Sequence, residues 1–398
     1  MRKVAAVLAL VLATGVAAGR VRAQATQVPA QPPAQIPSQS PAHAPAQTTG
    51  QADKLAELRA RAERGDPMAQ LNLGLVYAIG QGVAKDYGEA VVWYRKAAEQ
   101  GQATARLNLG WCYALGQGVP QDYAQAASWY RKAAEQGEPT AQLKLGALYA
   151  SGDGVPQDDA QAAAWYRKAA DLGEATAQFK LGMAFANGRG VEQDSAQAVL
   201  WYRKAAEQGK ATAQFMLGVM YERGHGVAQD DAAAAAWYRR AADQDDATAQ
   251  LNLGASFEQG RGVPQDFAEA AAWYRKAAEQ GDARAQSNLA FAYVSGRGVP
   301  RDPAQAMAWY RKAADQGHAT AQFDLGEMYA KGRGVSRDYV EAHRWVNLAA
   351  SRAAAAEDRA YFARMRDDLA TQMTPAEVTE AQRRAREWAD AFERRARK

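Results

Sequence analysis

Apolar residues follow two helical patterns in succession along residues 102–137. In the first pattern they recur at i, i+4 and i+8, and in the second at i, i+3, i+4 and i+7, with polar residues between them. Both spacings place the apolar side chains on one face of an α-helix. The residues are, in order, Ala105, Leu109 and Tyr113, and then Ala126, Trp129, Tyr130 and Ala133. The segment is therefore predicted to form two amphipathic helices, helix A and helix B.

This two-helix pattern returns every 36 residues. Its tryptophan keeps the period without slippage, at Trp93, Trp129, Trp165, Trp201, Trp237, Trp273, Trp309 and Trp345. A fixed period of roughly 20 to 50 residues is typical of stacked-repeat proteins, whose units bury their apolar faces against their neighbours. We predict an all-α solenoid of eight 36-residue helix-turn-helix repeats over residues 66–353. Its helices A and B should have about 13 and about 15 residues.

Glycine and aspartate mark the turn between the two helices. Helix A is expected to end at Gly116, because glycine adopts the left-handed cap conformation most easily. A Gly-x-Gly-Val turn follows, and its valine is expected to pack on the core. Asp122 is the predicted N-cap of helix B, and Gln125 three residues later predicts a reciprocal capping box. Gly110, inside helix A, predicts that a neighbouring helix backbone passes too close for a larger side chain.

The consensus of the eight units is Ala-x-x-x-Leu-Gly-x-x-Tyr-x-x-Gly-x-Gly-Val-x-x-Asp-x-x-x-Ala-x-x-Trp-Tyr-x-Lys-Ala-Ala. This pattern resembles the Sel1-like repeat, a relative of the tetratricopeptide repeat with a longer turn between its helices. The resemblance implies a right-handed α/α superhelix that acts as an adaptor in protein complexes, often in bacterial envelopes and signalling systems. It also implies an alternative, because some cysteine-rich members are credited with β-lactam binding or hydrolysis. Those members carry a cysteine pair in each repeat, whereas this chain has Cys112 alone.

One stripe on helix A varies from repeat to repeat, while most other positions are nearly constant. Positions 68, 72, 75 and 79 share the side of helix A opposite to the core stripe, and the variation is seen at positions 72 and 75 and their equivalents. In tetratricopeptide-like arrays that side lines a concave groove, and the resemblance implies the same here. The predicted protein-binding residues are Asn72, Leu75, Asn108, Trp111, Lys144, Lys180, Met183, Met216, Phe291 and Asp324. The alternative is that Trp111 and Phe291 fill gaps between repeats.

Residues of the catalytic and metal-binding types are scattered along the chain. His43, His225, His318 and His343 are far apart in sequence, and no His-x-x-x-His or Cys-x-x-Cys spacing occurs. Cys112 fits a small packed side chain on helix A. The Gly-x-Gly turns follow a helix and occur eight times, whereas a phosphate-binding loop follows a strand and occurs once. We predict no catalytic, metal or cofactor site, and therefore no enzyme.

The first 23 residues have the features of a secretory signal peptide. Arg2 and Lys3 precede the uncharged apolar run 4–19, and Val21-Arg22-Ala23 supplies small residues where a signal peptidase cleaves. The run is shorter than the roughly 20 residues of a spanning helix. We predict a periplasmic or secreted protein of the bacterial envelope, with no stable membrane insertion after cleavage. The alternative is an uncleaved anchor on a membrane-tethered regulator.

Composition and charge narrow the range of partners. Residues 24–50 are rich in Pro, Gln and Ala, and are predicted to be a disordered linker. The whole chain carries a net charge of +4, but residues 1–23 contribute four basic residues and no acidic one, so the rest is neutral. A neutral protein has no overall attraction to nucleic acid or anionic lipid. A protein or peptide partner is therefore expected.

Helices are predicted at both ends of the array. Residues 51–65 should form an N-terminal capping helix B, and residues 354–398 a C-terminal helical cap with a basic tail. Thr374, Pro375 and Glu377 mark the start of the last helix. Its arginine cluster at residues 383–386 is expected to be a solvated helix face. The alternative is contact with anionic lipid or an acidic partner.

Overall fold

The computed structural model describes residues 46–397, and their side chains from Asp53 onward. This part of the chain forms 19 α-helices and no strand. The A helices of repeats 1 to 8 are α3 (Pro67–Ile79), α5 (Ala103–Leu115), α7 (Pro139–Ser151), α9 (Ala175–Asn187), α11 (Ala211–Arg223), α13 (Ala247–Gln259), α15 (Ala283–Ser295) and α17 (Ala319–Lys331). The B helices are α4 (Tyr87–Glu99), α6 (Tyr123–Ala134), α8 (Asp159–Asp171), α10 (Ser195–Glu207), α12 (Asp231–Ala242), α14 (Phe267–Glu279), α16 (Pro303–Asp315) and α18 (Tyr339–Arg352). Helix α2 (Ala46–Glu63) precedes them, and α19 (Ala356–Ala370) and α20 (Pro375–Ala396) follow.

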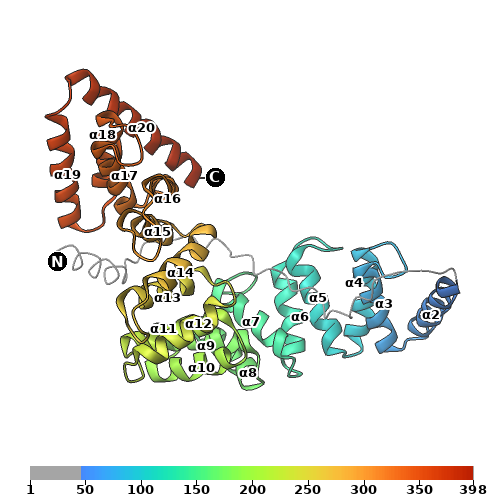
Figure 1. Cartoon of the computed structure of the whole chain (residues 1–398). Coiled ribbons are helices and arrows are strands. Elements are labelled where there is room, and N and C mark those ends of the chain that lie inside the picture. The colour runs from blue at the N-terminus through green and yellow to red at the C-terminus, as the bar shows by residue number, and fades with distance from the viewer. Residues whose placement is uncertain (1–45, 398) are drawn as a thin grey trace.

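The predicted all-α solenoid of eight helix pairs is confirmed. Each helix from α3 to α18 packs against the helix before it and the helix after it in the chain. The repeats follow one another in a long, bent array, with α2 at one end and α20 at the other (Figure 1). The B helices have 12 to 14 residues, fewer than predicted. They end earlier because the last glycine of the unit, such as Gly101, has a positive φ and turns the chain into the next helix.

The core repeats with the sequence. A leucine of each A helix, from Leu73 to Leu325, is completely buried. The tyrosine of the Trp-Tyr pair is buried in helix B of repeats 1 to 7. Six of the eight periodic tryptophans are buried, while Trp237 and Trp309 are half-buried. Buried side chains of one repeat contact those of the next, so the apolar layer continues along the array. This burial between units is what holds the solenoid together.

The glycine inside each A helix makes room for an aromatic ring. In repeats 1 to 6, a Cβ at this glycine would lie 2.5–2.8 Å from the ring of the tyrosine in the same repeat's helix B. The nearest backbone atom of that helix, a carbonyl oxygen, would be 3.2–3.3 Å away. The prediction that a helix backbone is the main obstacle to a larger side chain at this glycine was therefore wrong. The tyrosine ring, for example Tyr130 against Gly110, is the closer obstacle.

The aspartate before each B helix caps it as predicted, but the reciprocal half of the capping box is wrong. The Asp122 carboxylate accepts a hydrogen bond from the Gln125 backbone N–H at 2.9 Å. The Asp122 backbone N–H donates to the carbonyl of Tyr113 at 2.9 Å, and all eight N-cap residues make the equivalent bond to helix A. Because this N–H is already bonded, no Glu or Gln side chain is needed to satisfy it. The same bond closes the turn between the two helices.

The second glycine of the turn is required by stacking between repeats. Gly118 has φ 72°, and a Cβ there would overlap the backbone of Tyr87, the first residue of helix B in the preceding repeat. The equivalent glycines of repeats 3 to 8 meet the same obstacle. In repeat 1, which has no complete repeat before it, a Cβ at Gly82 would meet only a leucine side chain, 3.9 Å away. A glycine is therefore needed at this turn position because the backbone of the preceding repeat lies so close to it.

Polar side chains also tie neighbouring repeats together. The buried Gln142 donates from Nε2 to the carbonyl of Ala134 at 3.1 Å, across the junction of repeats 2 and 3. A glutamine makes this bond at six other junctions. Arg131 of helix B donates to the Tyr149 hydroxyl of the next repeat at 2.7 Å. Where phenylalanine replaces that tyrosine, as at Phe185, the arginine guanidinium lies over the ring instead.

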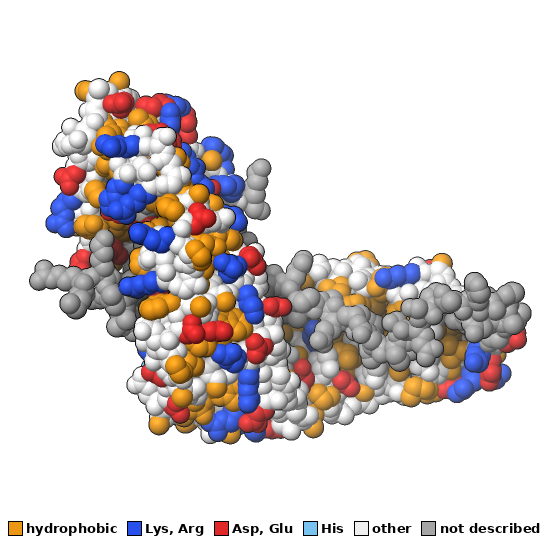
Figure 2. Space-filling view, viewed as in Figure 1, with side chains coloured by type: hydrophobic (Ala, Val, Ile, Leu, Met, Phe, Trp, Pro, Cys, Tyr) orange, Lys and Arg blue, Asp and Glu red, His pale blue; other side chains and the backbone are white. Residues whose placement is uncertain are grey.

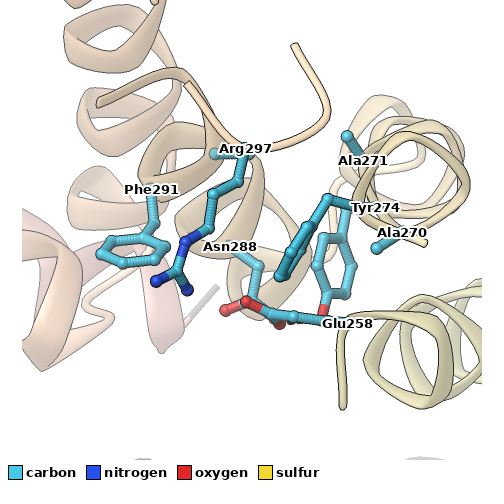
Figure 3. A pocket seen from close by; sticks show the side chains of 9 residues that line it. Glu258, Ala270, Ala271, Tyr274, Asn288, Phe291 and Arg297 are labelled. Carbon is cyan, nitrogen blue, oxygen red and sulfur yellow. Dashed lines mark hydrogen bonds between the residues drawn. The ribbon is translucent and has the colours of Figure 1, made fainter. Parts of the chain in front are cut away.

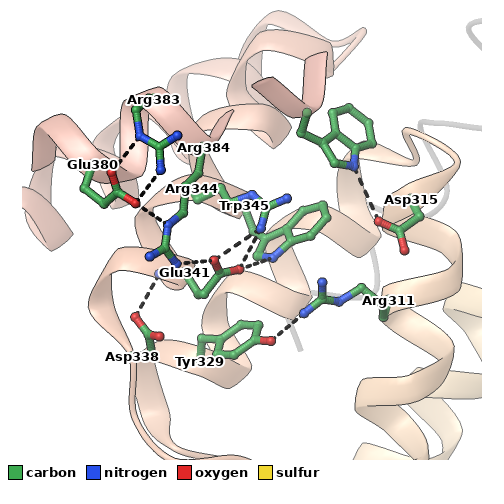
Figure 4. A network of polar contacts seen from close by, with 11 residues as sticks. Arg311, Asp315, Tyr329, Asp338, Glu341, Arg344, Trp345, Glu380, Arg383 and Arg384 are labelled. Atoms are coloured by element: carbon green, nitrogen blue, oxygen red, sulfur yellow. Dashed lines mark hydrogen bonds and ion pairs between the residues drawn. The ribbon is translucent and has the colours of Figure 1, made fainter. Parts of the chain in front are cut away.

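The C-terminal helices α19 and α20 both pack on α18. Glu341 of α18 lies at the centre of a polar network shown in Figure 4. Its carboxylate pairs with Arg344 at 3.0 Å and with Arg384 of α20 at 2.9 Å, and accepts a hydrogen bond from the Trp345 indole N–H at 3.1 Å. The predicted N-cap Thr374 and its partner Glu377 form a reciprocal capping box. Arg383 and Arg384 pair with Glu380 as well, so this part of the arginine cluster is engaged within the protein.

At the other end, α2 packs on α3 as a helix B would, and Arg59 donates to the Tyr77 hydroxyl. The helix begins at Ala46, so the last five residues of the predicted linker 24–50 are helical. A helix that has already nucleated extends at little cost. The predicted signal peptide, the remainder of the linker and His43 lie outside the described residues. Within residues 46–397, no helix combines the length and apolar character needed to cross a membrane.

Candidate protein-binding face

The solvent-facing side of the A helices forms one continuous surface, which we call the A face. In α3 it comprises residues 68, 72, 75 and 79, spaced so that they share one side of the helix. The opposite side of α3, including Ala69, Leu73 and Tyr77, is buried in the core. Because each A helix has the same orientation in its repeat, the equivalent positions of the other seven helices extend this surface along the array.

All ten residues predicted to bind a partner lie on A helices, and none is fully buried. Asn72, Lys180, Met183 and Phe291 are exposed, and the other six are half-buried. Met183 is 36% exposed and Phe291 is 45% exposed. The half-buried residues are Leu75, Asn108, Trp111, Lys144, Met216 and Asp324. The structure places these residues in a row along the A face, repeat by repeat, rather than around one pocket.

Two of the charged residues in this row have specific neighbours. Asp324 accepts a hydrogen bond from the hydroxyl of Tyr310, and burial together with this carboxylate raises the pKa of Tyr310 well above its usual value. Asp324 of repeat 8 is therefore directed toward helix B of the preceding repeat, α16. Burial by the surrounding side chains and repulsion from Lys210 lower the pKa of Lys180. The Lys180 ammonium is thus partly shielded from water although its side chain is accessible.

Sequence reasoning missed an apolar section of the A face in repeats 1 and 2. Met68 and Ile79 of α3 and Leu115 of α5 are each about half exposed. They flank the predicted residues Leu75 and Trp111 on the same helix faces. The signal was present in the sequence, because positions 68 and 79 belong to the same stripe as 72 and 75.

Sequence reasoning also missed the charged residues at the edge of the A face. In repeats 5 and 6, Glu222 and Glu258 accept hydrogen bonds from the hydroxyls of Tyr238 and Tyr274, at 2.7 and 2.6 Å. The turn residue Arg261 pairs with Glu222 at 2.9 Å. Its equivalent Arg297 lies beside the Phe291 ring (Figure 3). The middle residue of each Gly-x-Gly turn varies as much as the A face does, and that variation was the available signal.

Cavities in the described part of the chain do not favour a small-molecule site. The one beside Tyr274 and Phe291 holds about 10 Å³, no more than a single water needs. A shallow depression of about 430 Å³ is lined by Asp245, Lys276 and two other polar residues. Sites for drug-sized ligands are instead mostly apolar and enclosed.

Three residues of the catalytic and metal-binding types, Cys112, His318 and His343, are wholly or partly buried among the packed helices. Burial raises the pKa of the Cys112 thiol to about 12, which keeps it protonated and a poor nucleophile. His318 caps α17 by accepting from the Ala321 N–H at 3.3 Å. His343 is buried between α18 and α19, where burial lowers its pKa. No cluster of three or more His, Cys, Asp or Glu side chains suited to a metal ion occurs within the described residues.

Comparison with known families distinguishes between the Sel1-like repeat and the related tetratricopeptide repeat. The model of the Sel1 repeat matches eight consecutive segments: residues 67–102, 103–138, 139–174, 175–210, 211–246, 247–282, 283–318 and 319–353. The chain belongs to the Sel1 repeat family. The family boundaries fall between a helix B and the next helix A, as in the structure. Sel1 repeat proteins are generally non-enzymatic scaffolds for protein–protein interaction, and they typically bind protein partners.

Solved structures of other Sel1 repeat proteins are similar to this chain. A Sel1 repeat protein from Oxalobacter formigenes is 36% identical, with a TM-score of 0.61, over 84% of this chain and 98% of that one. The protein c5321, a protective antigen of uropathogenic Escherichia coli with an SLR fold, is 32% identical, with a TM-score of 0.53, over 86% of this chain and 97% of that one. Comparison with curated proteins gave no match.

The cysteine-rich branch is represented by Helicobacter pylori cysteine rich protein B. It is 29% identical over 34% of this chain and 96% of that one, with a TM-score of 0.27, which carries no argument about function. The lone Cys112 cannot form the cysteine pair that the β-lactam alternative implies in each repeat. No observation on the described residues favours that alternative.

Proposed function

We propose that this Sel1 repeat protein is an envelope scaffold that binds a polypeptide partner along its A face. The observation that carries the proposal is the variation of the A face within an array in which most other positions are nearly constant. A repeated scaffold presents the same chemistry in every unit, so recognition of one partner needs positions that differ. Exposed apolar side chains at some of these positions, such as Met183 and Phe291, can anchor a partner.

The charge distribution supports a polypeptide rather than a nucleic acid. On the surface drawn in Figure 2, basic and acidic side chains are interspersed with hydrophobic ones. A nucleic acid backbone needs a stripe of basic residues, because most of its affinity comes from neutralised phosphates. Mixed apolar and charged side chains instead suit an extended peptide or a protein surface.

Location in the periplasm or outside the cell is part of the proposal. It rests on the basic start, the apolar run and the small residues of the first 23 residues. N-terminal sequencing of the mature protein tests it, with a new terminus near residue 24 as the expected result. A mature protein that retains residues 1–23 would favour the membrane-tethered alternative.

Cross-linking and affinity capture from the envelope fraction test the binding face. The double variant Trp111→Ala, Lys180→Glu should lose partners that the native protein captures, because it removes an anchor and reverses a charge on the A face. Leu200→Ala is the matched control, since Leu200 is an exposed apolar residue on a B helix. Equal capture of the same partners by all three proteins would contradict the proposed face.

A further inference from the structure

Two neighbouring repeat junctions use the same positions but end in different contacts. At the junction of repeats 5 and 6, Glu222 accepts from Tyr238 and pairs with Arg261 at 2.9 Å. One repeat later, the Glu258 carboxylate accepts a hydrogen bond from the Tyr274 hydroxyl in the same way. Arg297, the equivalent of Arg261, is directed at aromatic rings instead. Its guanidinium carbon lies 5.9 Å from the ring centre of Phe291 and 5.3 Å from that of Phe267.

Two positions differ between these junctions. On the A face, repeat 6 has Ala255 where repeat 7 has Phe291, and at the start of the preceding helix B, the first junction has Asp231 where the second has Phe267. Repeat 7 has Phe291, and Figure 3 shows Arg297 next to its ring, with Glu258 turned toward Tyr274. A ring face attracts a guanidinium, by about 0.5–1 kcal/mol at an exposed site. Arg297 is therefore held at the surface beside an aromatic ring that is 45% exposed.

Repeat 7, which supplies both members of this pair, carries more basic than acidic residues, and the neighbouring Glu258 is engaged by the Tyr274 hydroxyl. Repeat 7, residues 283–318, contains five basic and two acidic residues, whereas repeat 6, residues 247–282, contains three basic and five acidic ones. Both acidic residues of repeat 7 already have partners within the protein. Asp302 caps α16, and Asp315 accepts a hydrogen bond from the Trp388 indole N–H at 3.4 Å. Arg284 lies two turns before Phe291 on the same side of α15. Its ion pair with Asp282, at 3.5 Å on the surface, contributes little.

We propose that the A face of repeat 7 is a subsite that binds an acidic, extended segment of the partner. In this segment one apolar side chain, flanked along the chain by two carboxylates, is the anchor. This inference rests on the proposed function and names the chemistry of its partner. The apolar side chain packs on the Phe291 ring, and the carboxylate next to it meets the Arg297 guanidinium. An arginine suits this role because its planar donors match a carboxylate.

The spacing along α15 sets the spacing in the partner. Arg284 and Phe291 are separated by seven residues, or roughly 10 Å along the helix axis. An extended chain covers that distance in about three residues. The segment should therefore carry one acidic residue three positions before its apolar residue, to reach Arg284, and another directly after it, to reach Arg297.

A designed peptide tests the subsite on the full chain. The probe is fluorescein-labelled, amidated Gly-Asp-Ser-Ala-Leu-Glu-Gly, and its control has Asn and Gln in place of the acids. Fluorescence anisotropy should show the control binding at least about tenfold more weakly, because it loses two charge-assisted contacts. Arg297→Gln and Phe291→Ala should each weaken binding about fivefold or more. Arg261→Gln is the matched variant, and should leave binding within about twofold because Arg261 is paired with Glu222.

Each other result overturns the inference. No binding of the probe by the native protein, or equal binding by Arg297→Gln, removes the subsite. An equal loss in Arg261→Gln assigns the effect to overall charge instead. Binding that is lost in Trp111→Ala but kept in Phe291→Ala places the peptide elsewhere on the A face, which overturns the subsite while the proposed function stands. Circular dichroism and thermal melting verify that each variant is folded.

Discussion

At the residue scale, most positions in this array are set by their place in the 36-residue unit, and Asp245 departs from that rule. It occupies the position where six other repeats have a glycine after helix B, and it has a positive φ of 63°. A residue with a Cβ pays strain in this conformation, less for Asp than for most others. Its carboxylate lies 3.4 Å from Nε2 of Gln250, whose amide also bonds the Ala242 carbonyl.

Asp245→Gly should therefore stabilise the protein by about 0.5–1 kcal/mol. The midpoint of urea unfolding should increase, because glycine adopts the turn without strain. Gly281→Asp, the reverse change at φ 99° one repeat later, should lower the midpoint by a similar amount. A lower midpoint for Asp245→Gly would mean that the Asp245 carboxylate contributes more than its backbone costs.

At the element scale, the turn between helices A and B is shaped by the repeat before it. Gly190 and Gly82 occupy equivalent turn positions with φ 69° and 74°. A Cβ at Gly190 would overlap the Asp159 carbonyl of the preceding repeat, whereas one at Gly82 has space. The two glycines thus share a conformational requirement and differ only in their neighbours.

Alanine substitution at these two glycines separates the two effects. Gly82→Ala should cost about 1–2 kcal/mol, the strain of a left-handed residue. Gly190→Ala should cost that amount and about 1–3 kcal/mol more, because the repeats must move apart to relieve the overlap. The measurement is the shift in the urea midpoint of each variant. Equal shifts would show that stacking places no constraint on the turn.

The C-terminal cap is an element whose stability should depend on pH. The pKa of His343 is lowered, first by burial and then by Arg366, so the folded state holds it neutral while the unfolded chain binds a proton below about pH 6.5. The pKa of Glu341 is also lowered, by Arg384 and Arg344 against the effect of burial. Its stabilising contribution is present above its ordinary pKa of 4.5 and is lost as the pH falls below that value. Both groups therefore make the cap less stable in acid.

Hydrogen exchange of α18 to α20 should accelerate as the pH falls from 7 to 5.5, after correction for the intrinsic rate. Glu341 titrates below this range, so the effect comes from His343 and from His318 at the start of α17, whose pKa burial also lowers. His343→Ala should reduce the effect, because it removes one of the two titrating groups. The variant should fold, because repeats 2 and 3 have Ala127 and Ala163 at the equivalent buried position. The same acceleration in His343→Ala and in the native protein would exclude His343 as a source of the effect.

At the scale of the whole molecule, the array is held together by contacts between successive repeats. Trp201 of repeat 4 is buried in a core cluster that reaches into repeat 5. In such an array stability is a sum over units and their junctions, so a defect in the middle can uncouple the two halves. A defect at one end removes only the terminal unit.

Trp201→Ala should cost about 3–5 kcal/mol, as expected for loss of a large buried side chain. The unfolding transition should become broader or split, because repeats 1 to 3 and 5 to 8 then unfold less cooperatively. Calorimetry measures both effects, and Leu200→Ala, at the exposed residue next to it, is the control. A melting temperature unchanged by Trp201→Ala would contradict the core assignment.

The sequence by itself determined the period, the helix pairs and the buried stripe of each helix. These features depend on interactions within a few residues: helical spacing of apolar side chains, the Asp122 cap and the Gly116 stop. The tertiary structure decided which atoms of different helices, turns and repeats meet. It assigned the cap N–H to a helix A carbonyl, the space at Gly110 to Tyr130, and Arg297 to the Phe291 ring rather than to Glu258. Such contacts depend on how closely repeats stack and on which side chain fills the equivalent position next door, and no local pattern along the chain contains that geometry.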